Sequence, residues 1–115
     1  MHNHRRGEIE AEIGGSRRRL VLTLGALAEL ESCFGAEDIV ALAERFGAGR
    51  LKAADLTRII AAGLRGAGEA VSDADVAQMP VPDGAAGYVR IAVALLEASF
   101  GSGEPAVPQV PQPPL

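Results

Sequence analysis

Residues 19–35 read RLVLTLGALAELESCFG, a stretch in which a strand passes directly into a helix. The hydroxyl of Thr23 is placed to cap a helix N-terminus. Apolar residues then recur at spacings of three and four, which predicts an amphipathic helix over about 24–34. Gly35 follows where a left-handed residue would end that helix. We therefore expect this stretch to form a corner of the core, with the later helices packed onto it.

A β-hairpin is predicted immediately upstream, over residues 8–22. Its first strand, residues 8–13, alternates between glutamate and an apolar residue, the pattern of a half-buried strand. The two glycines that follow both tolerate the positive φ values of a two-residue hairpin turn. Opposite charges then face each other on the exposed side and apolar residues on the buried side, so charge and burial favour one register. The pairs are Glu10 with Arg19, Glu12 with Arg17, and Ile9 with Leu20, the last buried with Leu22.

Four further helices are predicted after this corner from apolar residues at helical spacing and from caps. Glu37 and Asp38 are expected in the first turn of the next helix, where they oppose its dipole. Ser72 and Asp75 form a capping box for a short helix that must stop before Pro80. The last helix is apolar nearly all round, which is typical of a helix that is central to the fold or covered by a partner. The expected ranges are about 37–46, 53–65, 73–78 and 85–100.

The sequence therefore predicts an α+β fold, an N-terminal β-hairpin followed by a bundle of four to five short helices. We expect one α+β domain over residues 7–101. Residues 1–6 are basic and polar and are predicted to be a flexible leader. Residues 102–115 consist mainly of Gly, Pro, Val and Gln, a composition that builds no core. We expect this Pro-rich C-terminal tail to be disordered and extended.

Composition and charge narrow the class of protein. The chain has 115 residues, of which 48% are hydrophobic and 23% charged, as in ordinary globular proteins. Its net charge of -4 argues against attraction to nucleic acid or to an anionic membrane. The single cysteine, Cys33, allows no intramolecular disulfide and suits a reducing compartment. There is no apolar signal core and no apolar run of membrane length, so we expect a cytoplasmic protein.

Patterns that resemble catalytic or metal sites do not meet the spacing that those sites require. His2-Asn3-His4 spells a nuclease signature, but it lies in the leader and not across a ββα scaffold. Counted from Asp73, the central and twelfth positions of a calcium loop are Gln78 and Gly84, where the pattern needs Gly and Glu. The serines and Cys33 have no histidine base nearby. We expect no metal, no cofactor and no catalytic residue, and hence no enzyme.

Two features bear on nucleic-acid binding. Arg17, Arg18 and Arg19 form a basic cluster that could contact phosphates, but the predicted hairpin supplies glutamates opposite two of them. The helices over 37–46 and 53–65 could be read as a helix-turn-helix, although the second carries few polar side chains to reach base edges. A DNA-binding regulator is therefore the least favoured interpretation.

Four segments carry a family resemblance. They are Leu22–Glu31 with Phe34-Gly35, Asp55-Leu56 leading to Ile60–Gly66, Ser72-Asp73 with Val76, and the start at Arg6–Glu8. Through them, roughly residues 5–101 resemble the small tail proteins of gene transfer agents and related prophages. The shared features are a strand, a cap and helices, so they bear on the fold and are silent on chemistry.

That family looks like the tail assembly chaperone group of long-tailed phages, encoded between the major tail protein and the tape measure. The resemblance implies a protein that coats the apolar helix of the tape measure protein, recruits the major tail (tube) protein and then leaves the particle. It implies a place in the cytoplasm of the producing bacterium and absence from the mature particle. The alternative is a structural tail-tube or minor tail component, and self-association is left open.

Spare apolar surface is the feature of the residues themselves that points to a partner. The first and fifth predicted helices carry more aliphatic side chains than short helices need to bury, and an exposed apolar patch usually marks a protein partner. A groove of this kind would suit a long amphipathic helix. We expect partner contacts at Leu27, Leu30, Tyr88, Ile91 and Leu95, unless these residues form the core.

Overall fold

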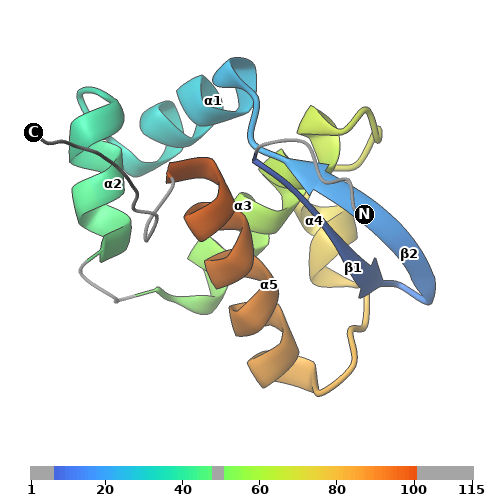
Figure 1. Ribbon diagram of the computed structural model, residues 1–115. Coiled ribbons are helices and arrows are strands. Elements are labelled where there is room, and N and C mark those ends of the chain that lie inside the picture. Colours follow the sequence, from blue (N-terminus) through green and yellow to red (C-terminus); the bar gives the residue numbers. More distant parts are fainter. Residues whose placement is uncertain (1–6, 48–50, 101–115) are drawn as a thin grey trace, which may run out of the picture.

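The computed structural model describes residues 7–47 and 51–100. The predicted leader over 1–6, the predicted tail over 102–115 and the middle of the loop between the second and third helices lie outside the described residues. The fold is α+β, a two-stranded hairpin followed by helices, as the sequence predicts (Figure 1). The elements are β1 (Glu8–Ile13), β2 (Ser16–Val21), α1 (Leu24–Phe34), α2 (Ile39–Gly47), α3 (Ala53–Gly66), α4 (Asp73–Ala77) and α5 (Gly84–Phe100).

The hairpin has the predicted register. Ile9 lies opposite Leu20, Glu10 opposite Arg19, and Glu12 opposite Arg17. Gly14 and Gly15 form the turn with φ of 64° and 84°, a backbone that residues with a Cβ adopt at a cost. The N–H of Gly14 also donates to the carbonyl oxygen of Pro80 at 2.8 Å, which holds the turn against the segment between α4 and α5.

The ion pairs of the hairpin run diagonally, which corrects the pairs predicted from the register. Arg17 contacts Glu10 at 3.3 Å instead of Glu12, its direct neighbour across the strands. Arg19 likewise contacts Glu8 at 2.9 Å. The right-handed twist of a two-stranded ribbon brings one diagonal neighbour within reach of a long arginine side chain, and the register alone does not show this.

The predicted caps of α1 and α4 are confirmed. The Thr23 hydroxyl accepts a hydrogen bond from the N–H of Ala26 at 3.1 Å, and Gly35 ends α1 with φ of 67°. Ser72 and Asp75 exchange both hydrogen bonds of a capping box, at 2.9 and 3.0 Å. These short-range signals give helix ends because each satisfies backbone groups that the helix leaves free.

The start of α2 differs from the prediction. The sequence predicts Glu37 and Asp38 within the first turn, but the helix begins at Ile39 and both residues stand before it. The Asp38 carboxylate accepts a hydrogen bond from the N–H of Ala41 at 2.8 Å. An aspartate at this position satisfies a free N–H of the first turn directly, which is why the N-cap is preferred over a place inside the helix.

The centre of the fold is α3, and not the strand–helix corner over residues 19–35 that the sequence predicts. It packs against β2, α1, α4 and α5. Figure 1 shows α3 and α5 between the hairpin on one side and α2 on the other. Three residues of α3 are fully buried: Ile59, Ile60 and Leu64. A helix buried to this extent cannot lie in a DNA groove, so the helix-turn-helix interpretation is wrong.

One arginine joins three parts of the chain around this centre. Arg65 of α3 donates to Glu29 of α1, to the carbonyl oxygen of Val71 at 2.9 Å, and to Asp73 of α4 at 3.4 Å. Burial lowers the pKa of Arg65, but the hydrogen bonds and charges of Glu29 and Asp73 more than offset this and raise it above its ordinary value. The guanidinium therefore stays charged and holds α1 and α4 to α3.

Candidate protein-binding groove

The residues expected to contact a partner lie mostly in the core. Leu30 and Leu95 are 1% and 0% exposed, and Leu27 is also buried. Tyr88 and Ile91 are partly buried, and the Tyr88 hydroxyl donates to the carbonyl oxygen of Met79. Leu30 and Leu95 thus have almost no surface to offer in this structure. Contact of a partner with the set as a whole stays a prediction.

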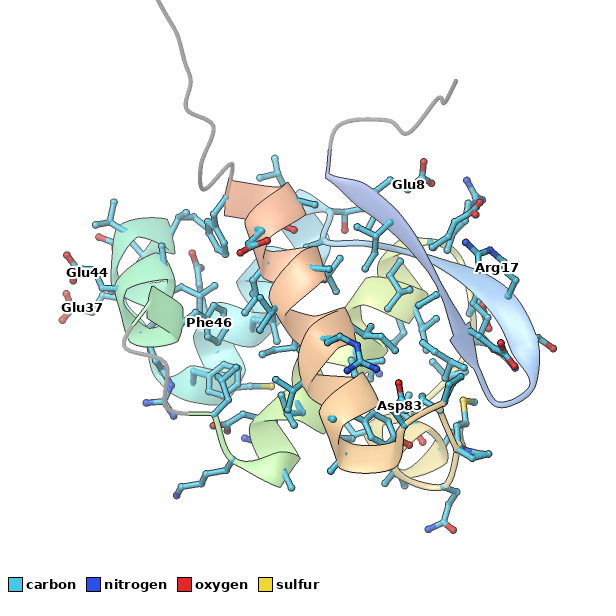
Figure 2. All side chains as sticks on the ribbon, turned by 60° about the horizontal axis from the view of Figure 1, so that its bottom comes forward. Glu8, Arg17, Glu37, Glu44, Phe46 and Asp83 are labelled. Carbon is cyan, nitrogen blue, oxygen red and sulfur yellow. The ribbon has the colours of Figure 1, made fainter. Side chains whose placement is uncertain are left out.

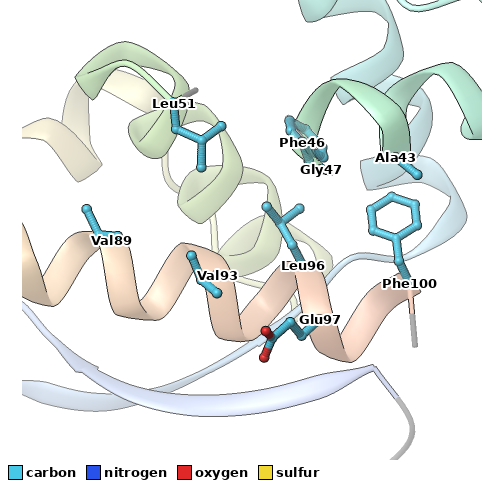
Figure 3. Close-up of a pocket in the computed structure, with 9 residues that line it drawn as sticks. All are labelled: Ala43, Phe46, Gly47, Leu51, Val89, Val93, Leu96, Glu97 and Phe100. Atoms are coloured by element: carbon cyan, nitrogen blue, oxygen red, sulfur yellow. The ribbon is translucent and has the colours of Figure 1, made fainter. Parts of the chain in front are cut away.

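A groove of about 470 Å³ lies between α2 and α5 (Figure 3). Leu96 and Phe100 point from α5 toward α2, and Leu51 approaches from the segment before α3. The carboxylate of Glu97 points away from Phe46, so the lining is apolar apart from one rim side chain. The full lining is Ala43, Phe46, Gly47, Leu51, Val89, Val93, Leu96, Glu97 and Phe100.

Two valines on α5 remain exposed in this groove. Val89 is 43% and Val93 38% exposed, although Ala92 and Leu95 of the same helix are fully buried. With Leu96 and Phe100 they repeat at spacings of four, three and four, so they form one stripe along the helix. The stripe starts one position after Tyr88, and one position is a rotation of about 100° around the helix axis.

One face of the apolar α5 packs in the core, as one of the two interpretations expects, whereas cover of another face by a partner stays a prediction. Its core face, which includes Ala92 and Leu95, is fully buried. Its next face, which includes Val89 and Val93, lines the groove. The expected contact residues of α5, which are Tyr88, Ile91 and Leu95, lie along the first of these two faces. The residues of the groove face recur at the same helical spacing as those of the core face. The sequence therefore has no feature that distinguishes the two stripes.

Aromatic residues close one end of the groove. Phe46 of α2 packs edge-on against Phe34 of α1, with ring centroids 5.3 Å apart. Its other neighbour is Phe100 of α5, at 6.4 Å. The guanidinium of Arg45 lies 4.9 Å from the Phe34 ring centre, a cation–π contact. All three phenylalanines of the chain thus gather here and set the spacing between α2 and α5.

The outer wall, α2, is a lightly held helix. It packs mainly against α1, whereas α3 and α5 each contact several elements. Figure 2 shows Glu37 and Glu44 pointing away from the molecule on this side, while Phe46 points inward. A peripheral helix with a polar outer face and an apolar inner face can form one wall of a groove that binds an apolar segment of a partner.

The polar clusters of the described residues have structural partners. Arg18, on the inner face of the hairpin, donates to the carbonyl oxygen of Ile13 at 2.7 Å and to Glu69 at 2.5 Å. Together with the pairs of Arg17 and Arg19, this gives each arginine of the basic cluster a glutamate. Within residues 7–47 and 51–100, no group of three or more His, Cys, Asp or Glu is placed to hold a metal ion. No helix in the same ranges is long and apolar enough to cross a membrane.

The groove is therefore the candidate site. Its lining fits apolar side chains, because it offers few polar groups to orient a cofactor. Residues 6–102 match the model of a family described as phage tail tube protein, GTA-gp10. Comparisons with curated proteins and with solved structures gave no match.

Proposed function

This chain belongs to the phage tail tube protein family GTA-gp10, and from that membership we propose that it is a non-catalytic structural component of a phage-like tail. The match over residues 6–102 is the observation that carries the proposal. In this role the protein binds other tail proteins and stays in the finished particle. The description of the family favours this role over that of a chaperone that leaves the particle.

The α2–α5 groove is the surface that we assign to a tail partner. It combines exposed Val89 and Val93 with the rings of Phe46 and Phe100. Aromatic side chains beside exposed aliphatic ones are typical of protein-binding surfaces. Contact between two tail proteins needs this kind of apolar patch and no catalytic group.

A chaperone that binds the tape measure protein in the cytoplasm of the producing bacterium is the second candidate. The shape of the groove favours it, because an apolar channel between two helices accepts one face of an amphipathic helix. In this role the protein would also recruit tail-tube subunits and would be absent from the mature particle. Both candidate roles use the same surface. They differ in whether this protein is still present in the particle after assembly.

Mass spectrometry of purified particles separates the two roles. A tail component is expected in particles at many copies, in a constant ratio to the major tail protein. A chaperone is expected to be absent from particles while co-purifying with a long helical protein from producing cells. Absence from both samples would contradict both candidates.

The assignment of the groove is tested by one substitution and a matched control. Val93→Glu places a charge in the groove, whereas Val40→Glu places the same charge on exposed α2 surface outside its lining. We expect Val93→Glu to reduce incorporation or partner capture at least about tenfold, the effect of losing roughly 1.4 kcal/mol. Val40→Glu should behave as the unchanged protein. Equal effects of the two variants would show that the groove is not the contact.

A further inference from the structure

A surface of α5 beside the groove faces outward over about three turns of the helix. Figure 2 shows α5, in pale orange, at the front of the molecule with no other element drawn over it. We call this surface the outer face. Its side chains are all exposed, and they are Ala86, Val89, Arg90, Val93, Ala94 and Glu97. The outer face shares Val89, Val93 and Glu97 with the lining of the groove.

The outer face is mostly apolar. Four of its six side chains are alanine or valine, whereas a helix face that meets only water is normally polar. An exposed apolar surface of this kind indicates contact with another protein. Ala86 and Ala94 are short, so a second helix can approach the axis of α5 closely. The surface therefore fits a helix, and its charges indicate which one.

Two opposite charges lie on the same edge of the outer face. Arg90 and Glu97 are seven residues apart, so they lie about 20° apart around the helix axis and about 10 Å apart along it. Arg90 pairs with Asp83 of the same molecule, and both of these side chains are mostly exposed. Within residues 7–47 and 51–100, no ion pair involves Glu97. This edge therefore presents a cation and an anion to solvent.

A second copy of α5 matches this edge when the two helices run antiparallel. A two-fold axis between residues 93 and 94 is equally far from positions 90 and 97. It therefore places Arg90 of each copy opposite Glu97 of the other, and it places Val93 beside the short Ala94 at the crossing point. A parallel pair would set both charges against the Val89 edge, where the outer face has no charged residue. The face is thus complementary to itself, as an isologous contact requires.

We propose that two molecules of this protein associate through their outer faces, with α5 antiparallel to α5 of the second copy. The apolar residues supply the attraction, and the two exposed Arg90–Glu97 pairs mainly set the orientation. A contact of about three helical turns is at the low end of interface size, so we expect a dissociation constant between about 10 μM and 1 mM. This association goes beyond the proposed function. It is measured on the purified protein alone, so it can fail while the role in the tail stands, and the reverse.

Analytical ultracentrifugation of the full chain, at about 10 μM to 1 mM, tests the contact. The average mass of the unchanged protein should rise with concentration from 11.9 kDa towards twice that value. Arg90→Glu and Glu97→Arg should each raise the dissociation constant at least about tenfold, because like charges then meet at both pairs. The control Glu44→Arg makes the same change on α2, where the side chain points away from the molecule, and should associate as the unchanged protein does (Figure 2).

A mixture of the two charge variants is the sharper measurement. Each variant by itself sets like charges against each other, whereas an equal mixture of Arg90→Glu and Glu97→Arg brings opposite charges together at both pairs. We expect the mixture to associate within about threefold of the unchanged protein. Circular dichroism checks that both variants are folded, as the exposure of both positions leads us to expect. The proposal is overturned by a mass that stays at 11.9 kDa up to about 1 mM, or by a mixture that stays dissociated while the unchanged protein dimerises.

Discussion

Gly66 is a position at which the backbone of α3 lies close to the backbone of the hairpin. A Cβ at this position would overlap the carbonyl oxygen of Val21 and lie 3.5 Å from the backbone nitrogen of Thr23. The obstacle is backbone, which cannot move aside as a side chain can. The absence of a side chain therefore lets α3 pack directly against the end of β2.

We expect Gly66→Ala to lower the free energy of unfolding by about 3 kcal/mol, because the hairpin and α3 must separate to admit a methyl group. Urea denaturation followed by circular dichroism measures this. Gly25→Ala is the control, since its Cβ would meet only the Thr23 hydroxyl at 3.8 Å. The control should be neutral or stabilise α1 by up to about 1 kcal/mol. Similar losses in both variants would refute the close approach.

Arg65 is the second residue with more than local influence. Arg65→Met would leave Glu29 without its cation and the carbonyl oxygen of Val71 without this donor. Asp73 would keep only Arg58, at 4.0 Å. We expect a loss of about 1–2 kcal/mol, reduced by the partial exposure of the carboxylates. Arg90→Met is the control because its pair with Asp83 is mostly exposed, and we expect it to cost less than about 0.5 kcal/mol.

The pH dependence of this difference follows from the pKa of Arg65. That pKa is raised on folding, so the contribution is complete below the unfolded-state pKa and is lost only as the pH rises through the folded-state value. Both values lie above the range in which proteins are usually handled. The difference between the unchanged protein and Arg65→Met should therefore be the same at pH 7 and pH 9. A difference that shrinks at pH 9 would contradict the assignment.

At the scale of elements, caps decide where helices begin. Thr23 lies in the two-residue connection between β2 and α1, and its hydroxyl caps α1. We expect Thr23→Ala to cost about 1 kcal/mol in the free energy of unfolding, the usual effect of removing an N-cap. Thr23→Ser keeps the hydroxyl and should cost much less in the same denaturation experiment. Equal losses would mean that the methyl group, and not the cap, stabilises this corner.

At the scale of the whole molecule, stability should fall from α3 outward. The central α3 contacts the hairpin and three helices, whereas α2 packs mainly against α1. Native-state hydrogen exchange should therefore find the slowest amides in α3 and faster local opening in α2. Slow exchange throughout α2 would contradict this order and would leave the groove with two rigid walls.

Short-range features of this chain were predictable. The hairpin register follows from the alternation of residues 8–13 and from Gly14-Gly15, and the structure confirms it. The caps at Thr23 and Ser72 depend on residues three positions apart, so they too are visible in sequence. The groove was not visible, because it depends on which of two neighbouring stripes of α5 meets the core.

The sequence by itself determined the α+β class, the register of the hairpin and the ends of most helices, because each depends on residues close together in the chain. Only the tertiary structure decided that α3 is central, that the backbone of Val21 packs against Gly66, and that Arg65 joins α1 to α4. It also decided which face of α5 is buried and which lines a groove. The reason is that both faces are apolar at the same spacing, and only packing against elements distant in sequence distinguishes them.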